Sequence, residues 1–132
     1  GFGLSSSVTY LCRFTSGQGS VSSAAAAPSS VTSSACVLPA WAYGEGDTTV
    51  ELYRVEGGSE TLVASNPAIT FLYEAGWTTF APSSAPAVGG RSVTVAGAGF
   101  VQQAGYYQCA FTSGGGDTAS VAAAATYAQL TC

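Results

Sequence analysis

Apolar and polar residues alternate along several short stretches of the chain, and this period of two predicts β-strands. Residues 8–14 alternate most clearly, so one face of this stretch is expected to be buried in a core. The buried face is expected to hold Val8, Tyr10, Cys12 and Phe14, and the opposite face Thr9, Leu11 and Arg13. Similar patterns predict further strands at 31–36, 48–55, 68–73, 91–97, 107–111 and 128–132.

Two stretches are less regular. Ala24–Ala27 has helical propensity, but four alanines between Ser-rich runs and a proline are too short to nucleate a helix. We therefore expect a weak strand or a loop there. Residues 78–90 are rich in Pro, Ser and Ala and are expected to lead into a second domain. Adjacent β-rich segments with turns between them predict an all-β, antiparallel sandwich.

The chain also contains an internal repeat, which changes how each strand is interpreted. Gly-Phe-Gly-Leu at 1–4, followed by Tyr10–Gly17, returns as Gly-Ala-Gly-Phe at 97–100, followed by Tyr107–Gly114. The offset is 96 residues at both ends of the motif and 97 residues between Cys12 and Cys109. The glycines of this corner are expected to supply a backbone conformation that residues with a Cβ resist. The sequence thus covers one full period and about a third of the next.

The four cysteines follow the same repeat. Each copy carries one pair at matching positions, so Cys12–Cys36 and Cys109–Cys132 form the simplest of the three connectivities. Zinc is excluded because the chain has no histidine and the cysteines are too far apart in sequence. Two structural disulfides indicate an oxidising compartment, extracellular or at the cell surface.

Charge is scarce, at 8% of residues with a net charge of −4, whereas a soluble domain usually has about 25%. Three scattered arginines (Arg13, Arg54, Arg91) form no basic patch, which argues against nucleic-acid binding. No apolar run approaches a membrane span, and no signal peptide is visible. Solubility must then come from Ser, Thr, Gly and Gln, or from covalently attached sugar.

Candidate catalytic and cofactor-binding groups are few. Without histidine there is no Ser–His or Cys–His dyad, and Gly114–Asp117 lacks the lysine of a phosphate-binding loop. Glu45 and Asp47 lie on a predicted turn without the spaced oxygen ligands of a calcium site. We predict no catalytic residue, no metal and no cofactor. A sugar-stacking surface remains a weaker alternative to a core role for four aromatics: Trp41, Trp77, Tyr106 and Tyr107.

The ordered motifs resemble a known family. Gly89–Phe100 is similar to the opening of an IPT/TIG domain, the immunoglobulin-like module of plexins and related receptors, with its Gly-Gly pair, Val-Thr-Val strand and Gly-x-Gly-Phe corner. Cys12–Phe14, Cys36–Pro39, Thr48–Val55 and Ile69–Tyr73 follow in the family's order. The alanine-rich stretches and the long connection at 74–88 depart from it. The resemblance implies tandem immunoglobulin-like β-sandwich domains with one disulfide per repeat.

The strand order predicts two partial domains. Residues 1–74 form an IPT/TIG-like domain lacking its first strands, and residues 75–132 one lacking its last strands. Either the sequence is a window of a longer tandem array, or units complete one another between chains by strand donation. Repetition in register favours a rod or filament built from copies of itself.

The Ala-Pro-Ser context resembles that of hydroxyproline-rich wall glycoproteins of plants and algae. Asn66 precedes Pro67, so it offers no N-glycosylation acceptor. We expect O-linked glycans, or glycans on hydroxylated proline, at Pro28, Ser29, Ser30, Pro82, Ser83, Ser84 and Pro86.

The function expected from these features is that of a structural repeat unit of an extracellular glycoprotein filament or cell-surface coat, not an enzyme. The first alternative is a ligand-binding or adhesive segment of a receptor-like ectodomain. The second is an accessory sugar-binding module of a secreted enzyme.

Overall fold

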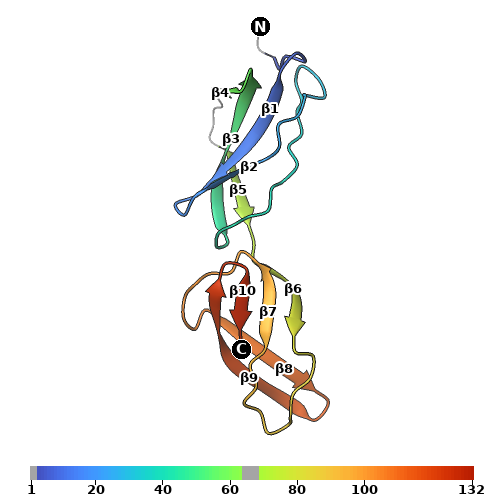
Figure 1. Cartoon of the computed structure of the whole chain (residues 1–132), viewed down its shortest axis with the longest axis vertical. Helices are drawn as coiled ribbons and strands as arrows, with labels where there is room; N and C mark the ends of the chain where they lie inside the picture. Colours follow the sequence, from blue (N-terminus) through green and yellow to red (C-terminus); the bar gives the residue numbers. More distant parts are fainter. Residues whose placement is uncertain (1–2, 64–68) are drawn as a thin grey trace. The chain divides into compact units, whose positions relative to one another are not determined.

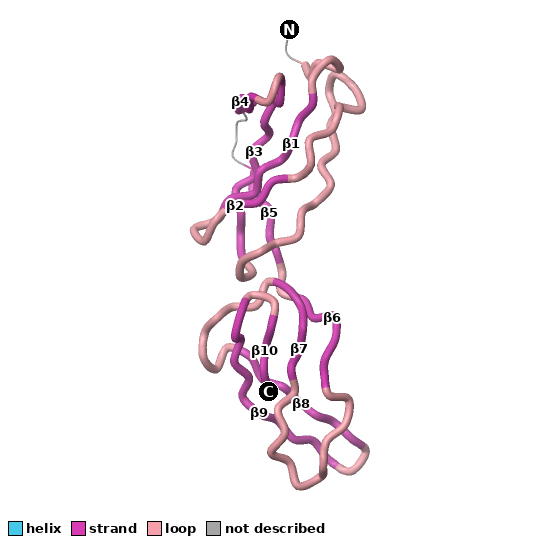
Figure 2. Tube along the Cα trace, in the orientation of Figure 1, coloured by secondary structure: helices cyan, strands magenta, loops and turns pink. Residues whose placement is uncertain are grey.

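The structure, a computed structural model, describes residues 3–63 and 69–132, apart from the side chains at 121, 123 and 125. Every regular element in these residues is a β-strand (Figures 1 and 2). Every pairing between strands is antiparallel. The chain divides into two compact units. Unit 1 comprises the described residues within Gly1–Ala40 and Gly46–Tyr73, and unit 2 comprises Trp41–Glu45 and Glu74–Cys132.

Unit 1 is a single five-stranded sheet. Its strands are β1 (Thr9–Thr15), β2 (Ser20–Ser22), β3 (Gly46–Glu56), β4 (Ser59–Val63) and β5 (Ile69–Tyr73). One side of β3 pairs along seven residues with β1, while its other side pairs with β4 in its second half and with β5 in its first half. Gly57 and Gly58, with φ of 58° and 83°, form the tight turn between β3 and β4, where two left-handed residues suit the strand twist.

The core of unit 1 lies on the face of β1 that the alternation predicts. Val8, Tyr10 and Phe14 are all buried there, and Tyr73 of β5 is buried as well. Leu11, on the opposite face, is also buried, which the alternation alone does not indicate. Its cross-strand neighbour is Tyr53, and an aromatic residue directly opposite on an antiparallel strand covers apolar surface on the same face.

Unit 2 contains the other five strands in the order β6-β7-β10-β9-β8. They are β6 (Gly76–Ala81), β7 (Thr94–Ala98), β8 (Tyr107–Ser113), β9 (Gly116–Thr126) and β10 (Gln129–Thr131). The long strand β9 pairs with β8 in its first part and with β10 near its end. Phe100, Ala122 and Leu130 form the buried centre of this unit.

Several expected boundaries differ from the observed ones. The strand expected at 31–36 does not form, and the described residues have an isolated bridge between Ser30 and Ser33 in its place. The connection at 74–88 contains a strand, β6, and the alanines at 122–125 lie within β9. Residues 41–45, expected in the first domain, belong to unit 2. For β6 and β9, pairing with neighbouring strands decides the local structure, and the pattern of a single segment does not contain that information.

Gly97 is fixed by the close approach of β6. A Cβ built on Gly97 would lie 2.1 Å from the carbonyl oxygen of Gly76 and 2.8 Å from the ring of Phe100. We therefore expect Gly97→Ala to destabilise unit 2 by about 1–3 kcal/mol, the cost of overpacking a tight contact. Gly114→Ala is the matched control, because a Cβ there meets no atom within 4 Å. Urea unfolding followed by tryptophan fluorescence measures both variants, and equal midpoints would contradict the prediction.

Candidate functional site

The sequence repeat is also a structural repeat, down to single hydrogen bonds. The hydroxyl of Tyr10 accepts a bond of 2.9 Å from the backbone N–H of Ser5, and the hydroxyl of Tyr107 accepts one of 2.8 Å from that of Val101. Each tyrosine thus holds the chain just after the Gly-x-Gly corner. Because the two bonds are formed by residues at equivalent positions, the two units share one local architecture.

The backbone around these corners matches as well. The N–H of Leu4 donates to the carbonyl of Val31, and that of Phe100 donates to the carbonyl of Tyr127, with the same 96-residue offset. Tyr10 pairs with Ala26 as Tyr107 pairs with Ala122. The Ala24–Ala27 run therefore lies beside β1 as an isolated bridge, within the expected range of weak strand or loop.

One disulfide closes each copy of the repeat. Cys12 is bonded to Cys36 and Cys109 to Cys132, with Cα–Cα distances of 6.0 and 6.1 Å. The described part of the chain has no free cysteine. Each disulfide links the strand that contains the tyrosine, β1 or β8, to the end of the same copy of the repeat. The two cysteines are 24 residues apart in the first copy and 23 in the second. Disulfides of this kind fit an oxidising environment.

The two units differ in how deeply they bury one pair of equivalent phenylalanines. Phe14 of β1 is 5% exposed, whereas Phe111, its equivalent in β8, is 49% exposed. Phe14 is covered by Phe71 and Tyr73 of β5, whose rings meet it edge to face at centroid distances of 5.6 and 5.7 Å. Burial raises the pKa of the Tyr73 hydroxyl, so the phenol is neutral at physiological pH. Among the described residues, unit 2 has no strand beyond β8, so Phe111 receives no such cover.

An apolar groove of about 470 Å³ follows from this difference. It is bounded on one side by β6, where Trp77 and Phe80 are largely exposed and contact each other edge to face at 6.3 Å. Phe111 of β8 closes the other side. The floor is formed by core residues of unit 2, among them Val95, Phe100, Tyr107 and Leu130. A pocket of this size, with few polar groups, suits apolar side chains more than sugars or ions.

The four aromatics considered for sugar stacking do not lie on one open surface. Trp41 is buried, and its indole N–H donates to the carbonyl of Gly44 over 2.8 Å. Tyr107 is half-buried beneath the corner, with its ring 5.6 Å from that of Phe100. Trp77 and Tyr106 are exposed, but only Trp77 lines the groove. The core role applies to Trp41 and Tyr107.

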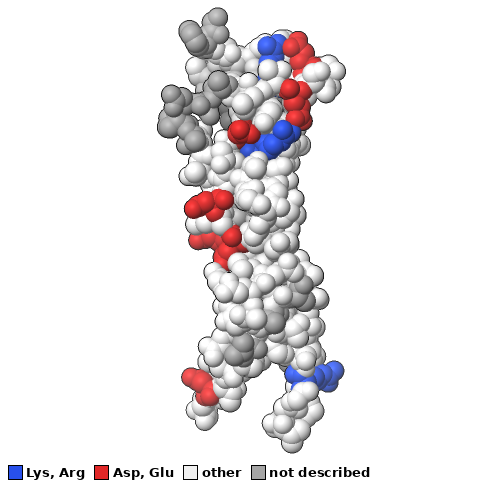
Figure 3. Space-filling view, turned by 90° about the vertical axis from the view of Figure 1, so that its left-hand side faces the viewer, with Lys and Arg blue, Asp and Glu red and all other residues white. Residues whose placement is uncertain are grey.

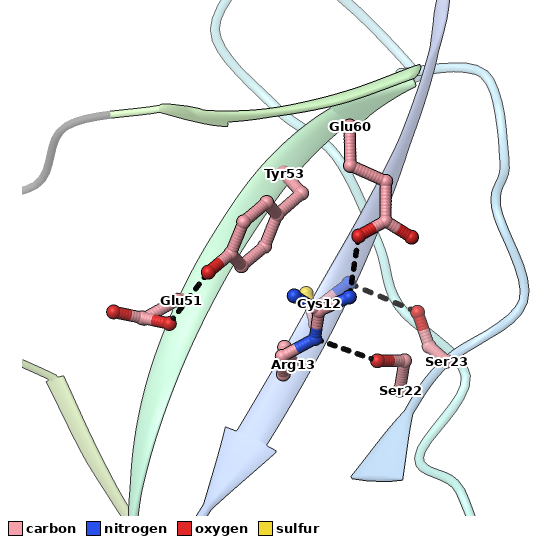
Figure 4. A network of polar contacts seen from close by, with 7 residues as sticks. All are labelled: Cys12, Arg13, Ser22, Ser23, Glu51, Tyr53 and Glu60. Carbon is pink, nitrogen blue, oxygen red and sulfur yellow. Dashed lines mark hydrogen bonds and ion pairs between the residues drawn. The ribbon is translucent and has the colours of Figure 1, made fainter. Parts of the chain in front are cut away.

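A polar network covers the outer face of unit 1 (Figure 4). Arg13 pairs with the carboxylate of Glu60, and its guanidinium lies 4.3 Å from the ring centroid of Tyr53. The hydrogen bond to Glu60 raises the pKa of Arg13, so this side chain is charged at any ordinary pH. The Tyr53 hydroxyl donates to Glu51. These contacts tie β1, β3 and β4 together.

The two carboxylates at the predicted turn belong to different units. Glu45 accepts a hydrogen bond of 3.0 Å from the N–H of Ala75 in unit 2, whereas Asp47 is an exposed residue of β3 in unit 1. The described residues contain no cluster of three or more His, Cys, Asp or Glu side chains suited to hold a metal ion.

The candidate modification sites are accessible. Ser29, Ser30, Ser83, Ser84 and Pro86 are exposed, and Pro28 and Pro82 are half-buried. All lie outside the strands. The surrounding surface carries few charges, and Figure 3 shows one face on which most of the surface is uncharged.

Comparisons with protein-family models, curated proteins and solved structures found no match. No helix long and apolar enough to cross a membrane occurs in the described residues.

Proposed function

We propose that the chain is a structural repeat unit of an extracellular glycoprotein filament or cell-surface coat, built from tandem immunoglobulin-like domains of the IPT/TIG kind and assembled head to tail. The observation that carries this proposal is the repeat itself. Two units on one chain form the same tyrosine hydroxyl bond, the same disulfide and the same backbone bonds at an offset of 96 or 97 residues. A unit that recurs in register builds an extended array, since each copy presents its neighbour with the same surface.

The surface chemistry supports a structural role. A catalytic site needs convergent titratable groups in a cleft, whereas the lining of the groove is mainly apolar. The two disulfides stabilise small units in an oxidising medium without a large core. Partners of this unit are then other copies of the same repeat.

Electron microscopy of native material tests the assembly. An antibody raised against residues 1–132 should label filaments along their length, with an axial spacing equal to one or two domains. Labelling of isolated particles alone would overturn the filament proposal. A pre-immune serum serves as the control for labelling.

A ligand-binding or adhesive segment is the second candidate, and the apolar groove of unit 2 favours it. The two functions differ in what the native chain does at high dilution. A filament subunit stays assembled, whereas an ectodomain segment is recovered as a single chain by sedimentation.

We also propose that O-linked glycans supply hydration to this charge-poor surface. Mass spectrometry of the native chain should show peptides containing 28–30 and 82–86 that are heavier than their sequences and lose the excess on chemical deglycosylation. Peptides from β3 serve as the internal control, because they lack the Ala-Pro-Ser context. A bare mass for both peptides would contradict the proposal.

A further inference from the structure

The structure offers a template for what fills the groove of unit 2. In unit 1, β3 pairs with β1 from Thr9 opposite Val55 to Thr15 opposite Thr49. Strand β5 pairs with the first half of β3, and its Phe71 and Tyr73 pack against Phe14. In unit 2 the strand equivalent to β1 is β8, which ends its sheet among the described residues.

The free edge of β8 is suited to pair with another strand. Tyr10 exchanges two backbone bonds of 2.8 and 2.9 Å with Ala26, on the side of β1 away from β3. Backbone groups alternate along a strand, so the amides of Leu11, Arg13 and Thr15 point toward β3. The repeat offset of 97 places Gln108, Ala110 and Thr112 at these positions in β8.

Nothing in the sequence of β8 blocks such pairing. Natural edge strands are usually protected by charges or proline, and Tyr107–Ser113 contains neither. Beside this edge lie the exposed ring of Phe111 and, across the groove, those of Trp77 and Phe80. An occupant must therefore supply both a strand and apolar side chains.

We propose that the groove of unit 2 binds a further copy of the segment 46–73, with a β3-like strand paired to β8 and the equivalents of Phe71 and Tyr73 covering Phe111. This inference rests on the proposed function, because it takes the partner to be another copy of the same repeat. The register of unit 1 transfers directly: Gln108 lies opposite the equivalent of Tyr53, and Phe111 opposite that of Val50. When a strand is added to a sheet edge, the backbone hydrogen bonds give affinity, and the pockets that receive every second side chain give specificity.

The test uses the full chain with both disulfides intact and a fluorescently labelled synthetic polypeptide of residues 46–73. We expect saturable binding with one polypeptide per chain, measured by anisotropy. Hydrogen exchange should slow at the amides of Gln108, Ala110 and Thr112. A polypeptide of the same composition in scrambled order is the control and should not bind.

Two substitutions locate the contact. Phe111→Ser should weaken binding roughly 30-fold, the loss typical of a buried aromatic anchor. Since Phe111 is half exposed in the chain alone, this variant should fold normally. Val88→Ser is the matched control, because Val88 is 94% exposed and does not line the groove, and it should bind as the original chain does.

Three results would overturn the inference: no binding, equal binding by Phe111→Ser, or slowed exchange confined to unit 1. These results are separable from the filament proposal. If the antibody labels native filaments but the polypeptide of residues 46–73 does not bind, only the assignment of the groove is overturned. If the chain is monomeric in native material but binds the polypeptide tightly through Phe111, the assignment of the groove is supported and only the filament proposal is overturned.

Discussion

Phe14→Ala is expected to destabilise unit 1 by about 3–5 kcal/mol, the range for removing a buried phenylalanine side chain. Phe14 is buried at the centre of an aromatic cluster, with Phe71 and Tyr73 against it edge to face. Truncation removes the apolar contact area and both ring contacts, and the sheet cannot close the space without moving β5.

Phe111→Ala provides the matched control. Phe111 occupies the equivalent position in the other copy of the repeat, yet half of its surface is exposed. We expect this substitution to cost no more than about 1 kcal/mol, since little burial is lost. Equal losses at the two positions would contradict the difference in burial.

The two units can be followed separately in this experiment. Both tryptophans, Trp41 and Trp77, belong to unit 2, so tryptophan fluorescence during urea unfolding follows that unit. Hydrogen exchange of the amides in β1 and β3 follows unit 1. Phe14→Ala should speed exchange in unit 1 while the fluorescence midpoint of unit 2 stays in place.

Removing either disulfide is the second large expected effect. Replacing Cys12 and Cys36 together by alanine should destabilise unit 1 by about 3–3.5 kcal/mol, and replacing Cys109 and Cys132 should do the same to unit 2. The value follows from the loop-closure entropy of about 25 residues that each bond removes from the unfolded chain. For units that bury only a few large side chains, this is a large share of the total stability.

Reduction of the original chain is the control for the disulfide variants. A thiol reductant should lower the unfolding midpoint of both units, but in each double variant it should affect only the unit that still has its bond. A variant as stable as the oxidised chain would show that its disulfide does not hold the unit together.

Much of the fold could be predicted from sequence where the signal is local. The alternation at 8–14 indicates the buried face of β1, and the Gly-Gly pair at 57–58 indicates a turn. The repeat pairs the cysteines that the structure joins. These features depend on side-chain period, backbone freedom and spacing, all of which are properties of short segments.

Other features could not be predicted in this way. Strand β6 (Gly76–Ala81) directly precedes a Pro- and Ser-rich stretch, and its bounds are set by its pairing with β7. Strand β9 extends through alanines because β8 and β10 lie beside it. Residues 41–45 belong to unit 2, where the N–H of Glu45 donates to the carbonyl of Gly99. Each outcome depends on a partner outside the segment itself, and local propensity is too weak to oppose that pairing.

The recurrence of a disulfide-linked strand after an offset of 96 or 97 residues can be read from the chain alone, because similar residues at similar spacing form similar local structure. That Phe14 is buried and Phe111 is not depends on how the strands of each unit pack. Both phenylalanines follow a cysteine by two residues and precede Thr-Ser-Gly, so nothing in their local sequence separates them. In unit 1, β3 pairs with β1, and β5 pairs with β3 and covers Phe14. In unit 2, Phe111 lines an open groove. Burial is a property of what packs against a residue, and that is set by the whole fold.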